Sequence, residues 1–167
     1  MRPARGYIFL LLAAFILGGC GYYIAGRGGR MPGGIERLAI PVFANETHKP
    51  DIEAAVTTAF VREMVNNVDV APGADAVMTG VIKSYTLTPV SFTKSDVNIE
   101  YRLTVALSLR ITRDGMELWR EDNVVDYEDF TVNTSDVAAT RDAERAALEK
   151  LAKDTARIVK ERMVSAF

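Results

Sequence analysis

The chain has 167 residues, 49% of them hydrophobic and 25% charged, which is the length and composition of a single globular domain. Its 20 basic and 22 acidic residues leave a net charge of −2, and without the two arginines of the first 19 residues the balance is 18 minus 22, or −4, which argues against a nucleic-acid partner. The single cysteine excludes an internal disulfide.

The first 19 residues have the order of a secretory signal peptide: two arginines, an apolar run over residues 7–17, and two glycines before Cys20. Counted to Gly19, the run has 13 residues, whereas a membrane-spanning helix needs about 20. The residues Leu-Gly-Gly-Cys at 17–20 resemble the bacterial lipobox, which implies cleavage before Cys20 and several acyl chains on it. Two or more chains hold firmly to a membrane. We predict a lipoprotein signal peptide over residues 1–19 and lipidation of Cys20; the alternative is a chance cysteine.

The residues after the cysteine indicate which membrane holds the chain and how the domain is joined to its lipid anchor. Gly21 stands in place of the aspartate that resembles an inner-membrane retention signal in enteric bacteria, which favours the cell outer membrane. Residues 20–34 are too rich in glycine for a helix and too interrupted for a long strand. A phosphate-binding loop would need a Lys-Ser/Thr ending and a preceding strand, which are absent. We predict a lipid-anchored flexible tether over 20–34 and a single domain over 35–167.

The sequence of the first half of the domain predicts a strand, then a helix, then a second strand. Residues 36–43 are mostly apolar, and Pro41 indicates a sheet edge or a strand end. Residues 50–66 begin with helix-start signals and carry apolar residues at helical spacing. Residues 76–87 are rich in β-formers. The predicted main face of this strand is Val77, Val81, Tyr85 and Leu87, with partial burial of Met78 and Ile82 on the other face.

The clearest pattern lies over residues 97–111, where apolar and polar residues alternate throughout and predict a strand with one buried face. The Asp114-Gly115 pair that follows favours a type I′ hairpin turn, because both central residues of that turn need positive φ. Residues 116–127 predict the partner strand. The predicted buried series of the first strand is Val97, Ile99, Tyr101, Leu103, Val105, Leu107, Leu109 and Ile111.

The last segment predicts a helix over residues 137–163, capped by Ser135 or Asp136, with an apolar stripe that Thr155 interrupts. The order of elements is therefore β-α-β-β-β-α. Because both helices are amphipathic, we predict an α+β fold with two helices packed on one face of a four-stranded mixed sheet.

Four stretches resemble, in their order along the chain, the LptE family of lipopolysaccharide-assembly lipoproteins. They are Cys-Gly-Tyr at 20–22, Met-Pro-Gly-Gly-Ile at 31–35, Ile-Pro-Val-Phe-Ala-Asn-Glu-Thr at 40–47 and Ala-Asp-Ala-Val-Met-Thr-Gly-Val-Ile at 74–82. The resemblance implies a two-helix, four-stranded domain that plugs the LptD β-barrel from the periplasmic side and helps that barrel to assemble. It also implies contact with lipopolysaccharide, which the complex inserts into the outer leaflet of the outer membrane, and no enzymatic activity.

Basic residues on the middle strands are the candidate ligands of lipopolysaccharide, because Lys and Arg make charge-assisted hydrogen bonds with phosphate oxygens. The candidates are Lys83, Lys94, Arg102 and Arg110. The two arginines share the polar face of one predicted strand. The alternative for this face is an ordinary solvated surface that also includes Glu100.

Three aromatic residues, Tyr85, Phe92 and Tyr101, are candidates for contact with a polar barrel lumen. Core packing explains each of them equally well. His48 is the only histidine and lies in a polar loop, and no nucleophile motif is present, so we expect no catalytic residue and no metal site. We expect no cofactor.

Two other functions compete with the barrel-plug interpretation. An auxiliary lipoprotein of a lipid-trafficking ABC transporter can share the lipobox and a small α+β domain, but it would bind the transporter or phospholipid. An envelope hydrolase is disfavoured by the missing nucleophile motif. Co-purification with a β-barrel distinguishes the barrel plug from the transporter lipoprotein. Turnover of ester or glycan substrates distinguishes the barrel plug from the hydrolase.

Overall fold

The computed structural model describes residues 31–92 and 98–165. The predicted signal peptide, the lipidation site Cys20, most of the predicted tether and the candidate ligand Lys94 lie outside these residues.

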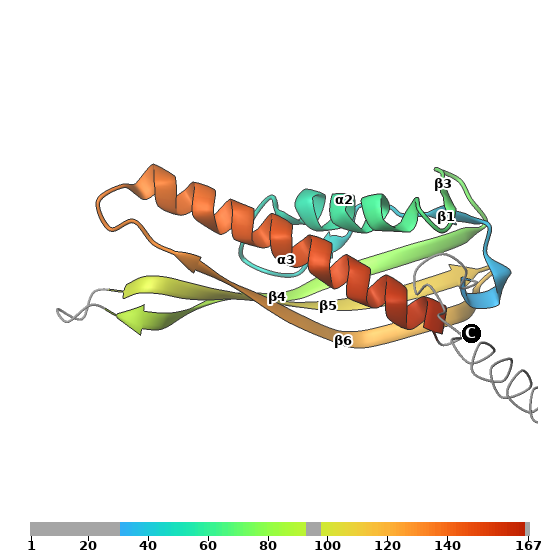
Figure 1. The fold of residues 1–167 in the computed structure, drawn as a ribbon. Helices are drawn as coiled ribbons and strands as arrows, with labels where there is room; N and C mark the ends of the chain where they lie inside the picture. The colour runs from blue at the N-terminus through green and yellow to red at the C-terminus, as the bar shows by residue number, and fades with distance from the viewer. Residues whose placement is uncertain (1–30, 93–97, 166–167) are drawn as a thin grey trace, which may run out of the picture.

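The described residues form one mixed sheet with both helices on the same face (Figure 1). The strands are β1 (Arg37–Ala39), β2 (Ala44–Asn45), β3 (Asp69–Val70), β4 (Ala76–Phe92), β5 (Asn98–Arg113) and β6 (Met116–Thr131). The helices are α2 (Ile52–Met64) and α3 (Val137–Ser165), and a short 3-10 turn, η1 (Pro32–Gly34), precedes them. The strand order is β3-β1-β4-β5-β6, with β2 beside β4. The predicted α+β class and the two-helix face are confirmed.

The sheet has six strands, so the predicted number of four is wrong. The apolar segment 36–43 supplies only the three residues of β1, and Pro41, which has no N–H to donate, lies between β1 and β2. The third short strand, β3, lies in the segment after α2 that carries turn residues, and it pairs parallel to β1. Strands of two residues are too short for an alternating pattern to be visible in the sequence.

The buried face of β4 is the reverse of the predicted one over the first half of the strand. Met78 and Ile82 are fully buried in the core. In contrast, Val77 and Val81 are only partly buried, and they pair with Thr112 and Ser108 in the polar series of β5.

A β-bulge explains this reversal. Ile82 pairs with Leu107 and Ser84 pairs with Ala106, so Lys83 is an extra residue without a partner on β5. One extra residue shifts the two-residue alternation, and Tyr85 therefore returns to the face of Ile82. The sequence carries no signal of its own for this extra residue.

Strand β5 and its hairpin agree with the prediction. Asp114 and Gly115 both have positive φ, 53° and 78°, as a type I′ turn requires. Antiparallel pairing joins β4 to β5 and β5 to β6. Five residues of the predicted buried series are at most 1% exposed: Leu103, Val105, Leu107, Leu109 and Ile111.

The two helices close the core over this face. Helix α2 buries Ile52, Val56, Phe60 and Met64, and α3 buries a stripe from Ala147 to Met163. Each buried aliphatic or aromatic side chain of this kind contributes roughly 1.5–3 kcal/mol. Asp136 is the cap of α3, because its carboxylate accepts the N–H of Ala139 at 3.0 Å. Within the described part of the chain, neither helix is both long and apolar enough to cross a membrane.

Candidate functional site

The face of β4, β5 and β6 that the helices leave open is polar and is the candidate interaction surface. It carries hydroxyl groups and arginines, because the alternate residues of β5 point away from the core. Two large apolar side chains of β6, Val125 and Tyr127, are more than half exposed there. The residues that β5 contributes are Arg102, Thr104, Ala106, Ser108, Arg110 and Thr112. We call this surface the outer face.

Arg102 is the most tightly held cation of the outer face. Its Nε and Nη2 each donate a hydrogen bond of 2.8 Å to Asp129, which lies directly opposite on β6. The guanidinium also lies 4.1 Å from the centre of the Tyr127 ring. The hydrogen bonds raise the pKa of Arg102 and lower the pKa of Asp129. The fork uses two of the five N–H donors of the guanidinium and leaves three for another acceptor.

The other two described candidates also have carboxylate partners. Arg110 pairs with Glu117 at 2.9 Å, and Lys83 pairs with Glu46 at 2.8 Å. Arg102 and Arg110 share the outer face as predicted, but eight residues of strand separate them by roughly 26 Å. One phosphate group cannot contact both arginines, so the described candidates do not form a single cluster.

A second polar group on the outer face was not predicted. Arg120 Nε contacts Asp122 at 2.7 Å, and the hydroxyl of Ser108 donates to the same carboxylate at 3.2 Å. The hydrogen bond from Arg120 lowers the pKa of Asp122. The outer face is therefore a surface of fixed, mutually neutralised charges.

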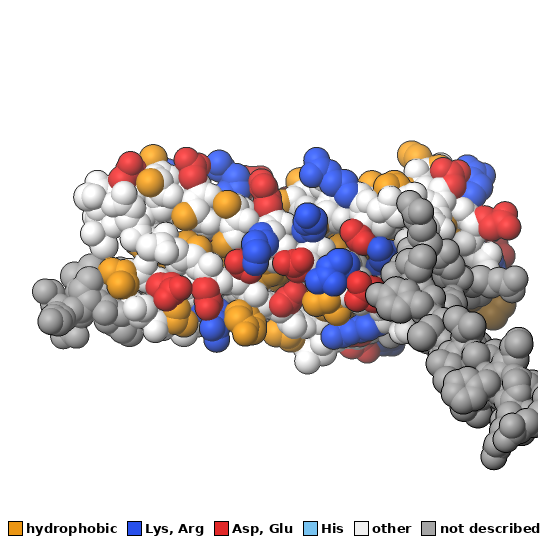
Figure 2. All heavy atoms as spheres, in the orientation of Figure 1, with side chains coloured by type: hydrophobic (Ala, Val, Ile, Leu, Met, Phe, Trp, Pro, Cys, Tyr) orange, Lys and Arg blue, Asp and Glu red, His pale blue; other side chains and the backbone are white. Residues whose placement is uncertain are grey.

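Ion pairs also join α3 to the edge strand β6. Glu128 pairs with Lys150 and Glu121 with Arg162, and the hydroxyl of Thr155 donates to Asp126 at 2.9 Å. Figure 2 shows the resulting mixture of basic and acidic side chains over the face that α3 and β6 present.

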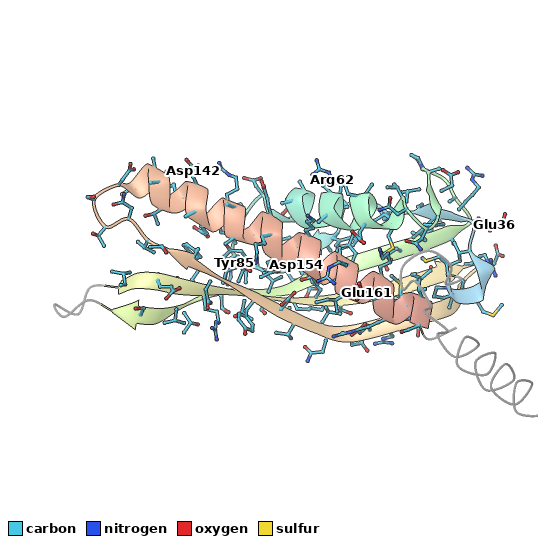
Figure 3. All side chains as sticks on the ribbon, in the orientation of Figure 1. Glu36, Arg62, Tyr85, Asp142, Asp154 and Glu161 are labelled. Carbon is cyan, nitrogen blue, oxygen red and sulfur yellow. The ribbon has the colours of Figure 1, made fainter. Side chains whose placement is uncertain are left out.

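A partly buried polar cluster holds the first half of α3 on β4. The hydroxyl of Tyr85 donates to Glu144 at 2.6 Å, and the ammonium of Lys49 contacts the same oxygen at 2.7 Å. Figure 3 shows Tyr85 in the layer between α3 and the sheet. Burial and the hydrogen bond to Glu144 raise the pKa of Tyr85. Burial alone would raise the pKa of Glu144, but the hydrogen bonds from Lys49 and Tyr85 outweigh it and lower that pKa.

This cluster borders a pocket of about 310 Å³ between the start of α2, the first turns of α3 and β4. Besides the cluster, the pocket is lined by Arg141 and Arg145 of α3, by Ile52 of α2 and by Asp51, which precedes α2. Sequence reasoning missed the group because Lys49 and Glu144 are 95 residues apart in the chain.

Two of the three aromatic candidates pack against the core. Tyr85 and Tyr101 are partly buried against it, and Tyr101 stacks on Phe130 with ring centres 6.2 Å apart. The side chain of Phe92 lies outside the described residues. His48 is exposed in its loop, and residues 31–92 and 98–165 contain no group of three potential metal ligands.

The family model LptE, described as "Lipopolysaccharide-assembly", matches residues 35–163. No curated protein matches the chain. A lipoprotein from Caulobacter crescentus CB15 has a similar structure, with a TM-score of 0.55 and 9% identity, over 75% of this chain and 89% of that one.

Two further structures have the same fold. The rare lipoprotein B from Shewanella oneidensis gives a TM-score of 0.54 at 15% identity, over 78% of this chain and 95% of that one. Lipoprotein B from Nitrosomonas europaea gives a TM-score of 0.54 at 15% identity, over 87% of this chain and 92% of that one. At these identities the likeness establishes the fold alone.

Proposed function

The chain belongs to the LptE family of lipopolysaccharide-assembly proteins, and on that premise we propose that it plugs and helps to assemble an LptD-type β-barrel. In this role it is an outer-membrane lipoprotein held by the acyl chains of Cys20. It acts by binding and not by catalysis. The complex inserts lipopolysaccharide into the outer leaflet of the outer membrane.

The polar character of the outer face is the observation that supports this proposal most directly. The interior of a transmembrane β-barrel is polar, so a plug needs a surface that remains favourable against hydroxyl and charged side chains. The outer face offers hydroxyl groups and ion pairs in which the charges are already neutralised within the chain. Strands of 16 or 17 residues extend to roughly 50 Å, enough to follow a barrel wall through its membrane-spanning height.

Lys83, Lys94, Arg102 and Arg110 are the proposed contacts with lipopolysaccharide. The three described members already bind carboxylates, so a phosphate group would use donors that remain free or would compete for those in use. Arg102 fits the first case, because three of its five donors do not take part in the fork with Asp129.

The test is a mild-detergent capture of the full, tagged lipoprotein from its own outer membrane, followed by mass spectrometry of the bound proteins. A β-barrel recovered at one copy per lipoprotein is the expected result. Recovery of an ABC transporter component, or recovery without a barrel, would overturn the proposal.

A further inference from the structure

The edge of β4 is covered over its first part and uncovered over its second part. Strand β1 pairs with Ala76 and Val77, and β2 pairs with Val81 and Ile82. Beyond Ile82, no strand of the described residues lies on that side of β4. Residues 86–90 are all exposed, including Leu87 at 41% and Val90 at 40%. The strand therefore ends in a free edge that runs from residue 84.

This free edge differs in chemistry from the opposite edge of the sheet. Residues 84–92 include no charged residue, whereas β6 contains six acidic residues and one arginine in 16. Charged side chains on an edge strand oppose the addition of another strand, and their absence permits it. By charge, the edge of β4 opposes an added strand less than the edge of β6 does.

Pro89 shows which backbone groups of the free edge point outward. Pro89 is paired with Tyr101 of β5, and because proline has no N–H, this must be a position where the strand makes no hydrogen bond to β5. Alternation then directs the N–H and carbonyl of Leu87 outward, together with the carbonyl of Pro89. The edge thus presents one donor and two acceptors within three residues.

The pocket that Tyr85 lines begins two residues before Leu87 along β4. Its three cations are Lys49, Arg141 and Arg145, and its two carboxylates are Asp51 and Glu144. Lys49 binds Glu144, and Arg145 binds Asp142. Arg141 has no carboxylate partner among the described residues. A carboxylate that entered this pocket would pair with Arg141.

We propose that the free edge of β4 around Leu87 accepts an extended segment of the barrel protein as an added strand, with an acidic side chain directed into the pocket at Arg141. This inference rests on the proposed function and specifies how the partner is held. Backbone hydrogen bonds give such a strand its affinity, and the pocket gives it a sequence preference.

A second copy of the chain fits this edge less well. It would bring no carboxylate on its own edge, since residues 84–92 are uncharged, and it would bring a second Arg141. Its Pro89 would also leave one outward acceptor without a donor. The charges of the pocket therefore favour a different polypeptide.

The first experiment places a photo-crosslinking benzoylphenylalanine at Thr88 in the full lipoprotein, in its own outer membrane. The matched control carries it at Thr79, an exposed threonine of the same strand where β1 and β2 cover the edge. Crosslinking from Thr88 to one extended segment of the barrel, which the Thr79 probe does not reach, is the expected result. Crosslinking of Thr88 to a second copy, or to lipid only, would overturn the inference.

The second experiment compares Leu87→Pro with Leu87→Thr. Both remove the leucine side chain, but only proline removes the outward N–H, and the ladder to β5 is retained in both. Barrel recovery should be several-fold lower for Leu87→Pro than for Leu87→Thr, the effect of one hydrogen bond. Equal recovery by the two variants would overturn strand addition and leave the proposed function standing. If the unchanged chain recovers no barrel, both the strand addition and the proposed function are overturned. If Leu87→Pro has a lower melting temperature than Leu87→Thr, its lower recovery could reflect lost stability. The crosslinking result from Thr88 then decides whether a strand is added at this edge.

Discussion

The two faces of β5 are made from alternate residues of one segment, and they serve different purposes. On the helix-covered face, Leu103, Val105, Leu107, Leu109 and Ile111 are at most 1% exposed and belong to the core that the helices cover. On the outer face, Arg102 and Arg110 are held by carboxylates of β6 in water. The first face derives its free energy from burial, and the second provides little stability, because exposed ion pairs are weak.

This difference means that stability and partner binding can be changed separately in one strand. A substitution on the covered face should lower the free energy of unfolding wherever it leaves a cavity or a clash. A substitution on the outer face should leave the fold intact and change only what binds to it. Four variants test how far the separation holds.

Leu107→Ala should have the largest effect on stability. The side chain is buried at the centre of the core, so its removal should lower the free energy of unfolding by about 2–5 kcal/mol. Urea unfolding of the mature domain measures this. Thr104→Ala, on the outer face of the same strand, is the control and should cost less than about 1 kcal/mol. Equal losses in the two variants would contradict the division between the faces.

Gly80→Ala tests the helix-covered face of the sheet by adding a methyl group to β4, opposite Leu109 of β5. A Cβ at Gly80 would lie 2.6 Å from ring atoms of Phe43, and that ring packs on Phe60 with centres 5.2 Å apart. Overpacking of this kind should cost about 1–3 kcal/mol. In the Phe43→Ala background the added methyl group should cost little, and a double-mutant cycle would show the coupling. Independent, additive losses would show that the ring is not the obstacle.

The covered face of β5 could be predicted from the sequence because its alternation has no interruption between residues 98 and 111. The covered face of β4 could not, because the extra residue at Lys83 reverses the alternation without a change in composition. The two-residue strands were also missed, since their pairing depends on backbone groups brought together by α2. Of the candidate site, Arg102 and Arg110 could be placed on one face, but their carboxylate partners could not.

Glu144→Gln tests the cluster of Lys49, Tyr85 and Glu144, which is a polar part of the mostly apolar covered face. The variant keeps the shape of the side chain but removes the charge opposite Lys49, and it should cost on the order of 1 kcal/mol at neutral pH. The folded-state pKa of Glu144 is below its ordinary value of 4.5, so this stabilisation is present above that pH and is lost as pH falls through the lowered pKa.

Thermal melting of both proteins from pH 7 to pH 3 measures this dependence. The difference in stability between the native chain and Glu144→Gln should be constant near neutrality and should shrink below pH 4.5. Glu149→Gln, an exposed residue of the same helix, is the control and should show no such change. A difference that grew as the pH fell would contradict the assigned charge on Glu144.

Arg102→Ala should have the smallest effect on the fold and should act on binding instead. The guanidinium is at the surface, so loss of the Asp129 fork should leave the melting temperature nearly unchanged. If its free donors contact lipopolysaccharide, retention of lipopolysaccharide by the purified lipoprotein should fall several-fold. Arg120→Ala is the matched control, because Arg120 lies on the same face with a carboxylate partner but is not a proposed ligand. Equal retention by the two variants would show that Arg102 only neutralises Asp129, and the phosphate contacts would then have to lie at other residues of the chain.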